Sequence, residues 1–298
     1  MPDKAKTEII ERICIKFFKT PYNQVPLFNG ASEENLDPLE KYIANHKVKR
    51  KVIKDTIGGI FFTKSKYQVL YFDVGSPPSK NFSKNYQSGP LSFEYYLDGV
   101  KIITNCGFGN NISNKAELIS RLTASQSTLT INDTSITKFE RNKLINRVFG
   151  NSIKNSFKTK ELNIQNDKRL FGCTISHNGY ENNFGCIHKR EIYLDHNDNK
   201  LRGVDHILKK SDGIPIRYVF RFHLNPKLTA VKTMSGSSAL IQISKNKSLI
   251  FTMKNENIEI EKGIYLGGRK ILDNNCISIS GNLVNKNKSF EWDIKKKI

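Results

Sequence analysis

Strand patterning dominates the chain from Lys47 onward. Short β-branched and aromatic runs recur roughly every 8–12 residues, separated by turns rich in Asn, Gly, Asp and Lys. Apolar and polar residues alternate through 187–194 and 218–224, which is typical of a sheet with one solvent-facing side. No strand–helix–strand alternation is present, so the pattern predicts an antiparallel sandwich or barrel. The predicted strands are 57–63, 67–73, 91–97, 100–105, 129–132, 160–164, 171–177, 186–195, 201–208, 215–224, 230–233, 239–244, 248–253, 258–261, 269–272, 276–283 and 289–293.

The strongest local signal is the Asp98-Gly99 pair between the runs 91–97 and 100–105. Both positions of a two-residue hairpin turn need a positive φ, which Asp and Gly tolerate, so the pair predicts a hairpin. The preceding stretch, 75–90, is a turn-rich polar loop with no hydrophobic period. Long loops in compact domains are often functional, so this one is a predicted binding surface.

The N-terminal pattern differs from the rest. Ile9, Ile10, Ile13 and Phe17 recur at helical spacing, which predicts an amphipathic helix that Pro21 ends. A second short helix is predicted over 33–44. The first residues carry scattered charges and not a basic stub followed by an apolar core, so no signal peptide is expected. The expected location is the cytoplasm or the cell envelope.

Composition narrows the function classes. The apolar runs 57–62 and 69–72 fall far below the roughly 18 residues of a membrane span. The formal charge of +20 favours attraction to polyanions, although dispersed lysines are also consistent with a general bias in composition. No recognisable nucleic-acid motif accompanies the charge, so nucleic acid is not the expected partner.

The cysteine positions indicate no disulfide framework, because the five cysteines are odd in number and form no C-x-x-C motif. A zinc site is an open alternative, because zinc ligands in proteins are usually Cys and His. The spacings of the four Cys and His residues in 173–188 match no common zinc module. The favoured interpretation is that they are buried framework residues. The Gly107-Phe108-Gly109 run is not a dinucleotide loop, because Ile112 occupies the third glycine position. The side chains considered for zinc are Cys173, His177, Cys186 and His188.

Several short motifs, in order, resemble the C-terminal domain of the heparinase II/III-like family of polysaccharide lyases. The resemblance spans most of residues 21–293. The segments that carry it are Leu27–Gly30, Asp73–Pro78, Gly89–Glu94, Asn105–Gly107, His177–Tyr180, Gly185–Arg190, Leu201–Asp205 and Arg221–Pro226.

The resemblance implies an all-β fold, a large antiparallel β-sandwich preceded by a short helical segment. Residues 1–44 would be a helical remnant and linker, and 45–298 the sandwich domain. In the family the residues that remove the C5 proton of a uronic acid and protonate the leaving oxygen lie mainly on an N-terminal α/α toroid. The resemblance therefore implies no catalytic residues in this chain, and elimination only with a separately encoded toroid.

Departures from the family pattern bear on metal binding. The family's three zinc-ligand positions fall on Gln87, Asn105 and Gln126, and a histidine that is catalytic in some members falls on Asn85. Neutral carboxamides are poor zinc ligands and cannot act as a base near neutral pH. No metal and no cofactor are expected.

The function that the resemblance still supports is binding of an acidic polysaccharide. The planar guanidinium of arginine can donate two parallel hydrogen bonds to a carboxylate of such a ligand. The alternative is a structural or remnant sandwich without a ligand, in which the same residues pack the fold. The candidate substrate-binding residues are Gln87, Asn105, Arg121, Gln126, His177, Tyr180, Arg190 and Arg221.

Overall fold

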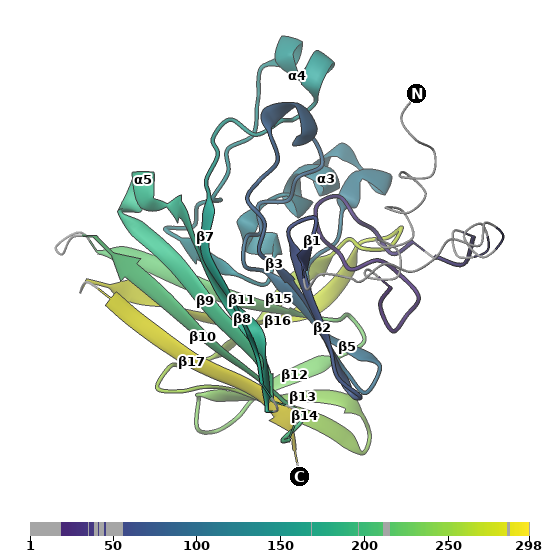
Figure 1. The fold of residues 1–298 in the computed structure, drawn as a ribbon, viewed down its shortest axis with the longest axis vertical. Helices are drawn as coiled ribbons and strands as arrows, with labels where there is room; N and C mark the ends of the chain where they lie inside the picture. Colours follow the sequence, from purple (N-terminus) through teal and green to yellow (C-terminus); the bar gives the residue numbers. More distant parts are fainter. Residues whose placement is uncertain are drawn as a thin grey trace.

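Two antiparallel sheets pack face to face in the computed structural model of the chain (Figure 1). The structure describes residues 19–34, 36–38, 41, 45, 56–167, 169–195, 197–210, 215–284 and 287–297. The predicted all-β antiparallel sandwich is confirmed. The predicted N-terminal helix over the first residues lies outside the described residues, as does half of the one over 33–44. The domain boundary near residue 45 stays a prediction.

The first sheet has the order β1-β2-β3-β4-β5-β11-β16-β15, and β6 pairs with β11. Its central hairpin is the predicted one: β4 and β5 are joined by Asp98 at φ 51° and Gly99 at φ 78°. The strands are β1 Thr56–Ile57, β2 Ile60–Lys64, β3 Gln68–Asp73, β4 Phe93–Leu97, β5 Val100–Thr104, β6 Leu129–Ile131, β11 Ile216–Leu224, β15 Glu259–Tyr265 and β16 Leu272–Leu283.

The second sheet has the order β12-β13-β14-β17-β10-β9-β8-β7. In Figure 1 its teal, green and yellow strands run side by side across the lower left. The strands are β7 Thr159–Asn166, β8 Leu170–Tyr180, β9 Cys186–Asp195, β10 Lys200–Lys209, β12 Thr229–Lys232, β13 Ser238–Ser244, β14 Lys247–Met253 and β17 Asn287–Lys296.

The core lies between the sheets and is rich in aromatic rings. Phe93 of β4 stacks on Trp292 of β17 with ring centroids 5.4 Å apart, and Phe222 of β11 meets the same indole edge-on at 5.0 Å. Gly203 of β10 makes room for this indole, because a Cβ there would lie 2.1 Å from the ring. Fully burying one such side chain stabilises the fold by roughly 1.5–3 kcal/mol, so these contacts lock the sheets together.

Three predicted strands need correction. The run 57–63 is two strands, because Gly58 and Gly59 turn the chain at φ 58° and 81°. Strand β4 begins at Phe93 and not at Leu91, which has a positive φ of 58°. The prediction of a strand over 269–272 was wrong, since β16 begins only at Leu272.

Short helical segments lie beyond one end of the sandwich. Helices α3 and α4 stand above the strands in Figure 1. No helix among the described residues is long and apolar enough to cross a membrane. The helical elements are η1 Lys80–Phe82, η2 Gly109–Asn111, α3 Asn114–Ser120, η3 Thr123–Ser125, α4 Lys143–Phe149 and α5 Glu181–Phe184.

Candidate functional site

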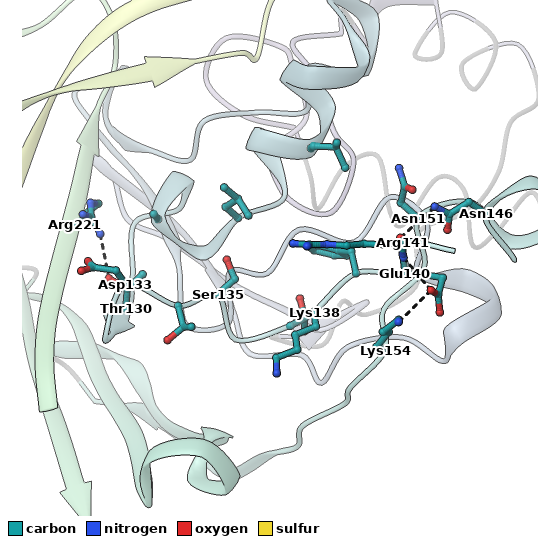
Figure 2. Close-up of a pocket in the computed structure, with 16 residues that line it drawn as sticks. Thr130, Asp133, Ser135, Lys138, Glu140, Arg141, Asn146, Asn151, Lys154 and Arg221 are labelled. Atoms are coloured by element: carbon teal, nitrogen blue, oxygen red, sulfur yellow. Dashed lines mark hydrogen bonds and ion pairs between the residues drawn. The ribbon is translucent and has the colours of Figure 1, made fainter. Parts of the chain in front are cut away.

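A cavity of about 1020 Å³ opens where the helical segments meet the first sheet. We call it the basic cavity. Its walls come from α3, the turn after β6, the segment 138–154 and one side chain of β11 (Figure 2). The charged side chains that line it are Asp133, Lys138, Glu140, Arg141, Lys154 and Arg221.

Segment 138–154 folds back on itself to form one wall. Glu140 N donates to Ser152 O at 2.8 Å and Lys154 N donates to Lys138 O at 2.7 Å, with α4 at the tip. The Asn142 side chain caps α4 by accepting from Leu144 N at 2.9 Å. The segment carries five basic residues and one acidic residue, and Lys138, Arg141 and Lys154 among them line the cavity.

Arg121, at the end of α3, fastens this wall to the loop 79–88. Its Nε and Nη2 donate to Tyr86 O and Ser83 O, both at 2.9 Å, and its guanidinium lies 4.0 Å from the centre of the Phe139 ring. The side chain is fully buried, and burial lowers the pKa of Arg121 to about 10. Arg121 is therefore still charged at neutral pH, and it holds the wall rather than facing solvent.

The cationic groups of the basic cavity differ in how they are partnered. Lys154 lies 3.1 Å from Glu140 Oε1, and the Asn142 N–H and this ammonium lower the pKa of Glu140. Arg221 donates to Thr130 Oγ1 at 3.0 Å and lies 3.7 Å from the half-exposed Glu261. Lys138 and Arg141 make no ion pair with any described residue, and Figure 2 shows both side chains at the cavity. These two cations are available to an anion.

Uncharged groups complete the lining. Thr137 is 2% exposed, and its Oγ1 has no hydrogen-bond partner among the described residues. The Oδ1 of Asn146 is likewise buried and unpartnered there. Leu118 and Leu122 of the α3 region are 47% and 41% exposed. The cavity thus offers charge, hydrogen-bonding groups and apolar surface together.

The three carboxamides at the positions for which the resemblance implied zinc ligands are all buried. Gln87 and Gln126 both donate to Ser120 O, at 2.8 and 2.7 Å, and Gln87 Oε1 accepts from Gly30 N. Asn105 accepts from Ser127 N at 3.0 Å and donates to Leu27 O at 3.3 Å. All three are at most 2% exposed. They join loops to the first sheet, and among the described residues no three His, Cys, Asp or Glu side chains gather to hold a metal.

A buried network contains His177 and Arg190 and crosses the sandwich. Gly179 N donates to His177 Nδ1, so the ring proton sits on Nε2 and points at His188 Nδ1, 3.3 Å away. His188 Nε2 in turn donates to Asp205 Oδ1 at 2.6 Å. Arg190 pairs with Asp205 and donates to Leu91 O and Ser127 O of the other layer at 2.6 and 3.0 Å.

Of the eight predicted substrate-binding residues, the structure brings only Arg221 to the basic cavity. Tyr180 is also buried, and its hydroxyl donates to Leu129 O at 2.9 Å. Substrate binding by the seven buried residues stays a prediction. Sequence reasoning missed Lys138, Arg141 and Thr137, although the basic bias of 138–154 was a visible signal.

The family model described as heparinase II/III-like, C-terminal, matches residues 56–293. No curated protein matches the chain. The heparan sulfate lyase HepC from Pedobacter heparinus is similar with a TM-score of 0.71 at 13% identity, covering 96% of this chain and 46% of that one. A heparinase III structure gives 0.69 at 13% identity, covering 96% and 47%. The chain spans less than half the length of each, and at this identity the likeness shows the fold.

Proposed function

Because this chain belongs to the heparinase II/III-like, C-terminal family, we propose that it binds an acidic polysaccharide in the basic cavity. The observation that carries the proposal is the pair Lys138 and Arg141, which face the cavity without an ion-pair partner among the described residues. Arg141 offers two parallel donors to a carboxylate or sulfate, and Lys138 offers a mobile point charge.

The rest of the lining suits a sugar chain. The volume of about 1020 Å³ is at the upper end of the range for small-molecule sites, enough for more than one sugar ring. Thr137 Oγ1 and Asn146 Oδ1 can accept hydrogen bonds from sugar hydroxyls, which would satisfy buried groups that now lack partners. Leu118 and Leu122 can pack against the apolar faces of sugar rings.

Elimination at a uronic acid needs more than binding. A base must take the C5 proton, an acid must protonate the leaving oxygen, and the carboxylate must be neutralised. Arg141 or Arg221 fits only the last of these tasks. We therefore place the acid and base on an α/α toroid supplied from outside these 298 residues, in keeping with the greater length of the lyases that share the fold.

A structural module without a ligand is the second candidate. It is favoured by the fact that seven of the eight residues suggested by the sequence are at most 2% exposed and bonded to other parts of the fold. Under this alternative the basic cavity is solvated surface and binds polyanions only through general charge.

A charge-matched pair of double variants separates the two candidates. We expect Lys138→Ala with Arg141→Ala to weaken binding of heparin and alginate oligosaccharides at least about tenfold, since each charged hydrogen bond contributes about 1.5–3 kcal/mol. The control is Lys254→Ala with Lys262→Ala, which removes the same charge from lysines that are 68% and 87% exposed. Calorimetric titration measures both, and equal losses in the two variants would support the structural module.

The elimination step has its own readout. Cleavage of a uronate polymer creates an unsaturated sugar that absorbs ultraviolet light. We expect no increase in absorbance when the purified 298-residue chain meets heparin or alginate. A steady increase that survives in the Lys254→Ala, Lys262→Ala control would show that the acid and base lie within this chain.

A further inference from the structure

A second, smaller cavity of about 360 Å³ lies just beyond the C-terminal end of β11. We call it the tyrosine cavity. It is lined by Tyr22, Gln24 and Glu33 of the N-terminal segment, by the residues that follow β11, and by Tyr265 at the end of β15. Chain segments far apart in sequence thus build one pocket.

Tyr22 is held in place before any ligand arrives. Its hydroxyl accepts from Lys101 N at 3.0 Å, and its ring meets the Tyr96 ring edge-on with centroids 5.9 Å apart. The side chain is nevertheless 37% exposed. A fixed, partly exposed ring is a suitable surface for a sugar ring, because little side-chain entropy is lost on contact.

The polar groups of the tyrosine cavity include both acceptors and donors. Tyr265 is 1% exposed and its hydroxyl donates to Glu33, and burial together with this carboxylate raises the pKa of Tyr265, so the proton stays in place. Gln24 Oε1 is buried and has no donor among the described residues. Lys227 adds one cation to the same lining as the Glu33 carboxylate. A sugar ring with hydroxyl groups can donate to the acceptors and accept from Lys227, whereas an anion would also meet the Glu33 carboxylate.

The two cavities lie close together along the chain. Arg221 of β11 lines the basic cavity, and Asn225, the residue that follows this strand, lines the tyrosine cavity. Four residues of extended chain span roughly 13 Å. This separation is short enough for one sugar oligomer to reach both cavities.

We propose that the tyrosine cavity is a second carbohydrate site, which takes an uncharged, hydroxyl-donating sugar ring stacked on Tyr22. The proposal rests on the proposed function, since it treats the ring as part of the acidic polymer held by the basic cavity. A free neutral sugar has the same chemistry and is tested as a separate source.

Oligosaccharide length is the sharpest test. We expect Tyr22→Ala to weaken calorimetric binding of an unsulfated heparosan hexasaccharide, in which uncharged N-acetylglucosamine alternates with glucuronate, about fivefold. Binding of the corresponding disaccharide should be unchanged, because only the longer chain reaches both cavities. Tyr22→Phe keeps the ring and should bind almost as wild type. Gln24→Ala is a second variant that spares the ring contacts. Tyr67→Ala, which removes a 42% exposed tyrosine elsewhere, is the control.

The outcomes separate this inference from the proposed function. Hexasaccharide binding that is unchanged in Tyr22→Ala and Gln24→Ala but weakened in Lys138→Ala, Arg141→Ala overturns the second site alone. Binding that none of these variants weakens, or no binding by the wild type, overturns both. Cellohexaose, which carries no charge, tests the other source: Tyr22-dependent binding supports a site for free neutral sugar, and its absence leaves the linked polymer as the ligand.

Discussion

Asp205 illustrates how much of the polar chemistry of this chain serves the interior. The carboxylate is fully buried and accepts from His188, from two nitrogens of Arg190 and from Trp292 Nε1 at 2.7 Å. Burial works to raise the pKa of Asp205, but Arg190 and His188 outweigh it and hold the pKa below its usual range. The group is therefore ionised at neutral pH.

Removing this charge should therefore be costly. We expect Asp205→Asn to lower the free energy of unfolding by about 3–5 kcal/mol, because it leaves the Arg190 guanidinium buried without a counter-charge. The measurement is urea unfolding followed by circular dichroism. Asp273→Asn is the matched control, since Asp273 is 76% exposed and 3.7 Å from Lys262, and an exposed pair is worth at most about 1 kcal/mol. Equal losses in the two variants would contradict a buried charge network.

The burial of Arg190 could have been predicted from the sequence. His188 and Arg190 have the same parity as Ile192 and Leu194 in the alternating run of β9, and that parity is the buried face. Arg190 was instead predicted to bind substrate because its side chain is charged, although the alternation of β9 places it on the buried face. What the sequence could not predict is that Asp205 and Trp292 lie on neighbouring strands opposite it, because strand order is not encoded locally.

At the scale of elements, the turn residues explain why some predicted strands are confirmed and others are wrong. Asp98-Gly99 placed its hairpin correctly, and the Gly58-Gly59 pair, a hairpin signal of the same kind, was overlooked inside an apolar run. Helix α3 was missed because its seven residues are too few to show a helical period. Its start is set instead by Ser113, whose side chain accepts from Ala116 N at 3.1 Å.

The wall of the basic cavity depends on contacts between such short elements. Arg121→Met should loosen segments 79–88 and 138–154 by about 2–4 kcal/mol, because two buried carbonyl groups lose charged donors and Phe139 loses its cation contact. Hydrogen exchange followed by mass spectrometry should show faster exchange there and unchanged exchange in β9, β10 and β17.

Arg169→Met is the comparison for this variant, since Arg169 is 55% exposed and pairs with the buried Asp195 of the second sheet. It should leave exchange in 138–154 unchanged. Uniformly faster exchange across both sheets in Arg121→Met would mean that the wall unfolds only with the whole sandwich, and that Arg121 stabilises the fold rather than this segment.

At the scale of the whole molecule, buried titratable groups set how stability responds to pH. Burial lowers the pKa of His177 and of His188, and it lowers the pKa of His223 to about 4. Unfolded histidines titrate near 6.5. Below that pH the unfolded chain binds more protons than the native protein, so these three groups make stability fall as pH drops from about 6.5 towards 4.

Asp73 changes the dependence of stability on pH in the opposite direction. It is 4% exposed, accepts one hydrogen bond from Gly75 N at 3.1 Å, and makes no ion pair with a described residue. Burial raises the pKa of Asp73 to about 7. Between about pH 4 and 7 the unfolded chain has released this proton while the native protein still holds it. Stability from this group is therefore lost as pH rises through that range.

Asp73→Asn isolates the contribution of Asp73 titration to stability, because the amide can accept the same hydrogen bond and cannot ionise. Relative to wild type, we expect the variant to gain about 1.4 kcal/mol of unfolding free energy for each pH unit between about pH 4 and 7, and to gain nothing further above 7 if the pKa is as stated. Urea unfolding at pH 4.5, 5.5, 6.5 and 7.5 measures the difference. A constant offset between the two proteins would mean that Asp73 titrates alike in the folded and unfolded chain, and that the end of β3 is open to water.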